Sequence, residues 1–346
     1  MSSTLDFIYP SPLQFAASIP SWTGLGDGVE AYKQQEYAKA LREFSLLADQ
    51  GDADAQYFLG SLYQHGDGVV KNIAKATPWL QKAAKQGHHG ATNALGVIYA
   101  NQGPATQTDE QAARCFLSVA KQDVAEAMYN LGLLLMHGRG VEQSTSKAAQ
   151  WFQKAAEHGI AAAQHKIGSL LASGEIKHKD NTTALDWYLK AADQGYEPAE
   201  YALGVLYHTG GHGAEKNDAT ALHWFSLAAK HQILPAQAQL ATLYDTGMGT
   251  TQDRIKAFYW YSEAAAQGDA DAQHALGEKY ATGDGVPQDF VLAYVWFNLA
   301  GAQGSAEAVE ARETLLEKMT ASQIENGQEM SRDYFERYVI NPNTTD

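Results

Sequence analysis

Alanine recurs along this chain at intervals of 36 residues, with one interval of 37, and each alanine opens a similar stretch of apolar and polar positions. The alanines are Ala55, Ala91, Ala127, Ala163, Ala199, Ala236, Ala272 and Ala308. If each is counted as position one, position five is leucine or isoleucine after the first seven alanines, and further apolar residues mostly fill positions eight and nine. Because spacings of three and four residues define one helical face, the pattern predicts a helix at the start of every repeat.

A glycine-containing turn and a second helix follow in most repeats. The turn reads HGDGV from His65, HGRGV from His137, TGMGT from Thr246 and TGDGV from Thr282. Its glycines stop the first helix and reverse the chain. The second helix carries an alanine and, three residues later, a tryptophan at Trp79, Trp151, Trp187, Trp224, Trp260 and Trp296. The predicted unit is a helical hairpin, with helices near residues 55–65 and 72–86 in the first full copy.

Glycine also fills position six, inside the predicted first helix. It stands there at Gly60, Gly96, Gly132, Gly168, Gly204 and Gly277, with Ala241 as the exception. A glycine inside a helix costs about 1 kcal/mol relative to alanine, so its recurrence needs a physical reason. We interpret it as the close approach of a neighbouring helix, which any Cβ would obstruct.

The period predicts an all-α solenoid, because units of this size bury their apolar faces only against their neighbours. We expect one elongated domain. Its predicted segments are an N-terminal extension (1–26), a divergent opening hairpin (27–54), seven full repeats (55–307), C-terminal capping helices (308–340) and a tail (341–346).

The repeat string AxxxLGxxYxxGxGVxxDxxKAxxWxxKAAxxG resembles the SEL-one-like repeat family, a relative of the tetratricopeptide repeats. The best single copy is AMYNLGLLLMHGRGVEQSTSKAAQWFQKAAEHG from Ala127, and the resemblance covers about residues 27–320. The segment from Tyr294 also resembles the closing segment of bacterial members. The resemblance implies a right-handed α/α superhelix that serves as an adaptor or scaffold for protein complexes.

Three repeats depart from the family pattern. The second has NQGPATQTDE in place of the glycine turn and Cys115 in place of tryptophan, which makes it a candidate for a weak joint or an apolar pocket unless its neighbours repack. The fourth replaces the turn with SGEIKHKD from Ser173. The fifth carries an extra residue in HTGGHG from His208.

In tetratricopeptide relatives the concave wall is lined by first-helix positions that face away from the core. By register these are unit positions three, seven, ten and eleven, which form one stripe. The predicted partner-binding residues are Tyr57, Ser61, His65, Asn93, Val97, Tyr129, Leu133, Met136, His137, His165, Tyr201, Val205 and His208. The three tyrosines would supply contact area for a peptide or a partner helix. Two alternatives are that each tyrosine packs against the next repeat, and that the convex or edge surface binds instead.

Net charge indicates the chemical class of the partner, and cysteine content indicates the compartment. Lys and Arg total 25 against 40 Asp and Glu, which gives a formal net charge of −15. Such an acidic chain repels nucleic acid and anionic membrane surfaces, so we expect a basic or apolar protein or peptide partner. Cys115 cannot form an internal disulfide, and no signal segment precedes the repeats, so we expect a cytoplasmic protein. The oligomeric state stays open.

The sequence signals for a catalytic site are weak. Ser118 and Ser144 begin Ser-x-x-Lys sequences like those of penicillin-recognising enzymes, and a cysteine-rich bacterial branch of the family is associated with β-lactam binding. The companion sequences and the paired cysteines are absent here. Cys115 lacks a basic partner and is expected to be a buried structural thiol.

A metal site is conceivable in the fifth repeat, where two histidines could share an ion with Glu215 or Asp218. The glycine-rich loop that carries His208 and His212 offers no preorganised spacing. We predict no catalytic residue, metal or cofactor. An enzyme regulator or weak β-lactam-binding hydrolase is the alternative function. His88 and His89, in an interhelical turn, are expected to be solvated.

Residues 1–26 lie outside the repeat and mix aromatic residues, among them Phe7, Tyr9 and Phe15, with prolines. This extension could be a loosely held terminus. Alternatively, it could dock on its own solenoid as a cap or as a pseudo-ligand that occludes the binding face.

Overall fold

The structure is a computed structural model that describes residues 5–9, 12, 25–102, 106–177 and 183–340. It divides into two compact units, Met1–Lys179 (unit 1) and Asp180–Asp346 (unit 2), with the boundary in the irregular turn of the fourth repeat. The described elements are helices, apart from an isolated bridge between Gly211 and Ala214. The predicted tail and most of the extension lie outside the described residues.

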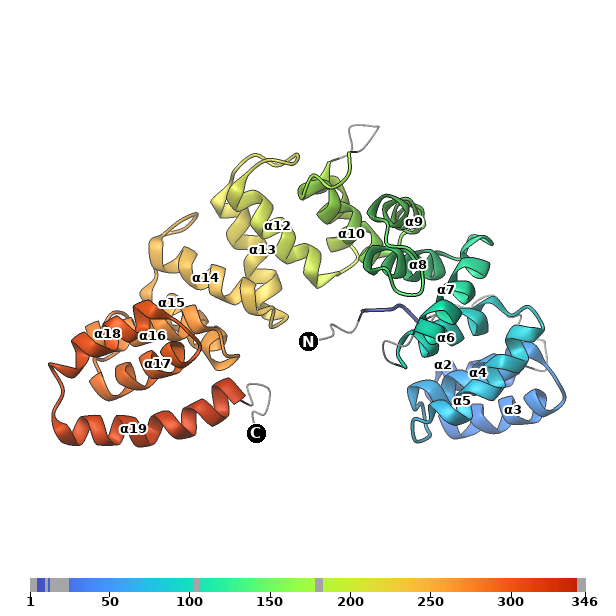
Figure 1. Cartoon of the computed structure of the whole chain (residues 1–346), viewed down its shortest axis with the longest axis horizontal. Coiled ribbons are helices and arrows are strands. Elements are labelled where there is room, and N and C mark those ends of the chain that lie inside the picture. Colours follow the sequence, from blue (N-terminus) through green and yellow to red (C-terminus); the bar gives the residue numbers. More distant parts are fainter. Residues whose placement is uncertain (1–4, 10–11, 13–24, 103–105, 178–182, 341–346) are drawn as a thin grey trace. The chain divides into compact units, whose positions relative to one another are not determined.

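Unit 1 is a succession of antiparallel helical hairpins (Figure 1). Its helices are α2 (Gly26–Lys33), α3 (Tyr37–Asp49), α4 (Ala53–His65), α5 (Ile73–Lys85), α6 (His89–Ala100), α7 (Thr106–Ala120), α8 (Ala125–His137), α9 (Thr145–Glu157) and α10 (Ala161–Ala172). Consecutive helices pack together along the series, from α2 against α3 to α9 against α10. Each hairpin therefore leans on its sequence neighbours, as the period predicts.

Unit 2 repeats the same arrangement and ends with two α-helices that follow the last repeat. It contains α11 (Ala184–Ala192), α12 (Glu197–Thr209), α13 (Asp218–Lys230), α14 (Leu234–Thr246), α15 (Arg254–Ala266), α16 (Ala270–Thr282), α17 (Phe290–Ala302), α18 (Ala306–Leu316), α19 (Ala321–Phe335) and the π-helix η1 (Glu336–Ile340). A capping box between Thr320 and Gln323 starts α19. The predicted fold class, an all-α solenoid of helical hairpins, is confirmed.

Short polar side chains fix where the second helices begin. In each case a side-chain oxygen accepts the backbone N–H three residues further on, which satisfies a donor that the helix cannot pair. These caps are Asn72, Ser144, Asn217, Asp253 and Asp289. Left-handed glycines end the preceding first helices at Gly66, Gly138, Gly247 and Gly283. The chain reversals are thus encoded locally.

The glycine at position six makes room for a side chain of the second helix. A Cβ there would stand 2.5–2.7 Å from the residue that follows the tryptophan slot. The pairs are Gly60 with Leu80, Gly96 with Phe116, Gly132 with Phe152, Gly204 with Phe225, and Gly277 with Phe297. The predicted close approach is confirmed, but the approaching group is a fully buried side chain of the same hairpin.

The recurring tryptophans of the second helices are less buried than their regular spacing suggests. Trp187 and Trp296 are buried, whereas the other four tryptophans are only half-buried. A lysine ammonium lies over three of the rings, at 3.9–4.7 Å from the centroid, in the pairs Lys82–Trp79, Lys154–Trp151 and Lys190–Trp187. These indoles therefore cover the hydrophobic core, and the residue after each one fills it.

The second glycine of each turn joins consecutive repeats. A Cβ at this position would collide with the start of the second helix of the preceding repeat. The contacts are Gly68 on Tyr37, Gly140 on Asp109, Gly249 on Asp218 and Gly285 on Arg254. These turns therefore do more than reverse the chain, because they set how closely neighbouring hairpins stack.

Candidate functional site: the first-helix face of unit 1

Most residues of the predicted contact stripe in unit 1 are buried. Exposed fractions are 0–2% for Tyr57, Ser61, Asn93, Val97, Tyr129 and Leu133. Met136 and His165 are half-buried, and His65 and His137 are exposed. In unit 2, Tyr201, Val205 and His208 are half-buried. The stripe therefore does not present its two N-terminal tyrosines to solvent.

Tyr57 packs against the next repeat, which was one of the alternatives for the tyrosines. Its ring stacks on His88 at 4.4 Å between centroids and lies against Gly90, so both contacts come from the start of α6. Burial raises the pKa of Tyr57 above its usual value. Tyr129 and Tyr201 instead pack on the second helix of their own hairpins, 5.5 Å from Phe152 and 5.8 Å from Phe225.

The N-terminal residues dock beside α8. The backbone N–H of Ile8 donates to Asn130 Oδ1 at 2.8 Å, and Asn130 Nδ2 donates to the Ile8 carbonyl at 2.8 Å. The same Nδ2 donates to Asn93 Oδ1 at 3.2 Å. One side-chain amide thus pairs with both backbone groups of one residue, as a neighbouring β-strand would. The N-terminal stretch lies next to α6 and α8 (Figure 1).

Phe7 enters a socket made by Phe116 and Arg139. Its ring, 9% exposed, lies 5.9 Å from the Phe116 ring at an interplanar angle of 27°. The Arg139 guanidinium lies 5.7 Å from the Phe7 centroid, within range of a cation–π contact. Two acceptors hold this guanidinium, the Asp109 carboxylate at 2.5 Å and the Ala100 carbonyl at 2.6 Å. We call Phe116 and Arg139 the Phe7 socket.

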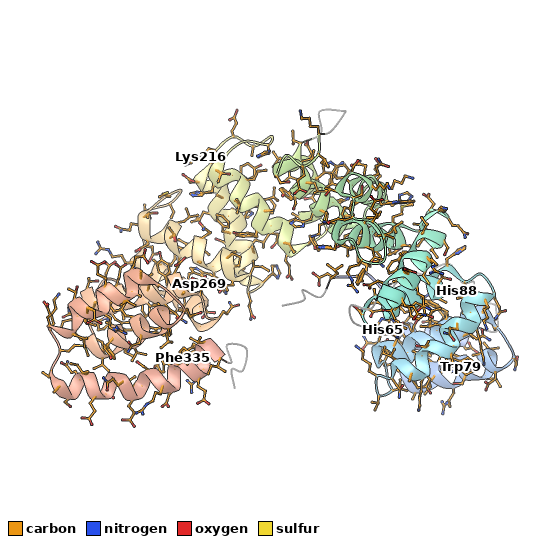
Figure 2. The ribbon with its side chains drawn as sticks, in the orientation of Figure 1. His65, Trp79, His88, Lys216, Asp269 and Phe335 are labelled. Atoms are coloured by element: carbon orange, nitrogen blue, oxygen red, sulfur yellow. The ribbon has the colours of Figure 1, made fainter. Side chains whose placement is uncertain are left out.

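Tyr9 is held by two residues at the ends of α4 and α6. Its ring meets His65 edge-on at 5.5 Å, and its hydroxyl accepts a hydrogen bond from Asn101 Nδ2 at 3.1 Å. His65 Nδ1 also lies 3.0 Å from the Ser61 carbonyl, which fixes the imidazole at the helix end labelled in Figure 2. We call His65 and Asn101 the Tyr9 socket. The two sockets and Asn130 together make up the first-helix face.

The local sequence explains why Arg139 points at Phe7. Gly138 ends α8 in the left-handed conformation, and Gly140 lies against the backbone of Asp109 at the start of α7. Arg139 is fixed between them, and its ion pair with Asp109, 8% exposed, crosses from one repeat to the next. The HGRGV turn therefore builds one wall of the face in addition to reversing the chain.

Sequence reasoning missed the residues that do most of the holding: Phe116, Asn130, Arg139 and Asn101. Asn130 lies at unit position four, where the other repeats carry Phe58, Ala94, Lys166, Ala202, Gln239 and Ala275. A polar amide in a position that varies between repeats was the available signal. Residues 5–9 dock on the repeats of unit 1, which favours the docked alternative for this part of the extension over a loosely held terminus.

The residues weighed for catalysis have structural roles here. Ser144 caps α9, accepting the Lys147 N–H at 3.3 Å, so its Ser-x-x-Lys sequence is a helix start. Burial raises the pKa of the half-buried Cys115 thiol to about 11, which leaves little reactive thiolate at neutral pH. His208 Nδ1 lies 2.7 Å from Asp218 Oδ1. Among the described residues, no cluster of three metal-ligating side chains comes together.

His88 corrects an expectation, because it is buried at 7% exposure whereas His89 is exposed. Its Nδ1 accepts the Ala91 N–H at 3.1 Å and caps α6, and its ring stacks on Tyr57. Burial lowers the pKa of His88 to about 4. The turn position suggested solvation, but the helix start draws the imidazole inward.

Unit 2 has a cavity of about 490 Å³ lined in part by Asp245, Tyr261 and Lys279. Lys279 is 4% exposed and fills position eight, where the other repeats have leucine or isoleucine. Its ammonium donates to Asp245 at 2.6 Å and to Asp284 at 3.1 Å. Two carboxylates therefore neutralise the buried ammonium, and we assign this network a structural role.

A model of the Sel1 repeat matches residues 53–88, 125–160, 161–196, 197–232, 234–269 and 270–305, which is more than half of the chain. The chain belongs to the Sel1-repeat family. Proteins of this family generally act as protein–protein interaction scaffolds. The hairpin of α6 and α7, which lacks the glycine turn and contributes Phe116 to the Phe7 socket, is not among the matched Sel1 repeats.

Two solved structures resemble this Sel1-repeat chain over most of its length. A Sel1 repeat protein from Oxalobacter formigenes is 28% identical, with a TM-score of 0.62, and the match covers 91% of this chain and 97% of that one. A protective antigen of uropathogenic Escherichia coli with an SLR fold is 29% identical, with a TM-score of 0.56, covering 88% and 73%. Comparison with curated proteins gives no match. No helix in the described ranges is long and apolar enough to cross a membrane.

Proposed function

We propose that this protein is an interaction scaffold that binds a peptide segment of a partner protein on the first-helix face of unit 1. One observation carries the proposal: a segment without regular secondary structure already lies there, held through both backbone groups of Ile8 by Asn130. Contacts to backbone groups bind any segment of suitable shape, and the sockets on either side add selectivity. Binding by this face, a protein or peptide partner and a cytoplasmic location stay predictions.

Site-specific photo-crosslinking in cells tests the proposal. A photoreactive residue replaces His137, which is exposed at the end of α8, and in a separate variant it replaces Leu46, which is 60% exposed on α3. We expect a crosslinked partner protein from position 137 and none from position 46. Crosslinking from position 46 alone would assign binding to the surface of α3 and contradict the proposal.

A further inference from the structure

We infer that the first-helix face selects a partner segment with aromatic residues two positions apart, and that Phe7 and Tyr9 occupy its sockets in cis until such a segment displaces them. This inference rests on the proposed peptide-binding function. It names the chemistry of the ligand, an extended stretch of the form aromatic-x-aromatic, and it makes the N-terminal segment a regulator of access to the face.

The two-residue spacing of Phe7 and Tyr9 follows from how the face binds the segment between them. Asn130 engages only the backbone of Ile8, so it fixes the register of the segment and leaves the side chain at that position free. In an extended chain, side chains two residues apart point to the same side. Phe7 and Tyr9 stand on either side of Ile8, whose two backbone groups pair with Asn130 as in a strand, and each has its own socket. The face therefore specifies positions i and i+2.

The two sockets favour different aromatic side chains. The Phe7 socket offers a stacked ring and a guanidinium that is already bonded to Asp109 and Ala100. The Tyr9 socket offers an amide donor to a phenolic oxygen. A segment with phenylalanine first and tyrosine second satisfies both. The side chain between them, that of Ile8, contributes less to the choice, because Asn130 pairs only with the Ile8 backbone.

When residues 7–9 occupy the face, some buried polar side chains of α4 and α6 still have no described hydrogen-bond partner. Asn93 is fully buried beside Asn130, and no described group accepts from its Nδ2. Gln64, 2% exposed near the end of α4, has neither amide atom paired within the described residues. Leaving a buried amide unpaired is unfavourable, because the group has lost its hydrogen bonds to water and gained none in the protein. A partner whose backbone carbonyl reached Asn93 would recover part of this free energy, so the cis segment is a suboptimal occupant.

Tethering explains how a suboptimal segment still occupies the face. The sequence between Tyr9 and the start of α2 at Gly26 is short, and a short tether gives an effective concentration on the order of millimolar. Weak docking is then enough to hold the segment in place. A free peptide must compete with it, and we expect its apparent affinity to fall by about tenfold.

Fluorescence anisotropy with a labelled, end-capped Leu-Asp-Phe-Ile-Tyr peptide tests the inference on the full chain. The matched control peptide is Leu-Asp-Ile-Phe-Tyr, which has the same composition with adjacent aromatics. We expect the first peptide to bind the Phe7→Ala, Tyr9→Ala double variant about tenfold more tightly than the wild type. The control peptide should bind both chains at least tenfold more weakly than the first peptide binds the double variant.

Further variants locate the binding site. In the double-variant background, Asn130→Ala should lower the affinity for the first peptide at least tenfold. Asn298→Ala should leave binding unchanged, because the partners of this α17 amide among the described residues are Ser331 and Arg312, which both belong to unit 2. Equal binding of the two peptides would overturn the aromatic spacing.

Other outcomes separate the inference from the proposed function. Equal affinity of wild type and double variant would overturn cis occupancy while leaving peptide binding in place. Absence of peptide binding to every chain would overturn the ligand chemistry, and crosslinking from position 137 would still decide the scaffold function. A wild-type dimer that dissociates in the double variant, measured by sedimentation, would place the segment on a second copy and contradict docking in cis.

Discussion

At the scale of single residues, a few polar side chains make contacts that their sequence positions do not suggest. His88 lies in an interhelical turn, yet it caps α6 and stacks on Tyr57. Asn130 lies in a helix of a repeat, yet it bonds Ile8, 122 residues away in sequence. The cap itself recurs in other repeats, at Asp52, Asp269 and Ser305. The bond of Asn130 to Ile8 cannot be predicted from the repeat pattern, because it depends on a segment outside the repeats.

The buried imidazole makes stability depend on pH. The pKa of His88 is about 4 in the folded protein and about 6.5 in an unfolded chain. Between these values the unfolded chain binds the extra proton, so stability is lost as the pH falls from 7 towards 4. We expect His88→Asn, which can still cap α6, to reduce the loss between pH 7 and pH 5 by roughly 1–2 kcal/mol in urea unfolding.

The matched control for that prediction is His89→Asn, since His89 is exposed. It should leave the pH dependence as in the wild type. Some acid sensitivity should persist in the His88 variant because burial also lowers the pKa of His165 to about 4. An unchanged slope in the His88→Asn variant would contradict the burial of this imidazole.

At the scale of the helical hairpin, the pairing of a glycine with a large buried side chain recurs from one repeat to the next. The exception supports the rule: where position six is Ala241, the corresponding Tyr261 is only half-buried, and its hydroxyl lies 3.3 Å from the Thr242 hydroxyl. The ring that would press on the glycine elsewhere lies nearer the surface here. This repeat therefore differs from the five pairs above at both positions, Ala241 and Tyr261.

This packing predicts strong coupling between Gly132 and Phe152. The Cβ of Gly132→Ala would stand 2.6 Å from the Phe152 ring, so we expect a loss of about 1–3 kcal/mol in urea unfolding. In the Phe152→Ala background the same change should cost at least 1 kcal/mol less. In the Phe225→Ala background, where the ring belongs to another hairpin, the losses should add. Additive losses for both pairs would contradict the contact.

At the scale of the whole molecule, sequence gives the repeats and their stacking because each depends on neighbours close in the chain. The hairpins, the glycine turns, the caps and the capping box of α19 all follow local rules. The binding stripe was predicted by register from relatives, but this chain packs Tyr57 on the next repeat and Tyr129 on its own hairpin. What covers the face depends on Asn130, Arg139 and residues outside the repeat, which periodicity cannot reveal.

If each hairpin packs only on its neighbours, a destabilising substitution should reduce protection from hydrogen exchange only in nearby helices. Gly277→Ala places a Cβ 2.5 Å from the Phe297 ring, so amide hydrogen exchange should quicken in α16 and α17. The helices α4 and α5 of unit 1 should keep their wild-type exchange rates. The reciprocal variant, Gly60→Ala, should affect α4 and α5 and spare α16 and α17. Equal loss of protection throughout the chain in either variant would contradict a nearest-neighbour stack.

The exchange rate of the Ile8 backbone amide tests the central claim most directly, because this N–H donates to Asn130 Oδ1 only while residues 5–9 lie on the first-helix face. We predict exchange at least tenfold slower than in an unstructured peptide for the wild-type chain, and unprotected exchange in Asn130→Ala. An Ile8 amide that exchanges in the wild type as fast as in a free peptide would contradict the account.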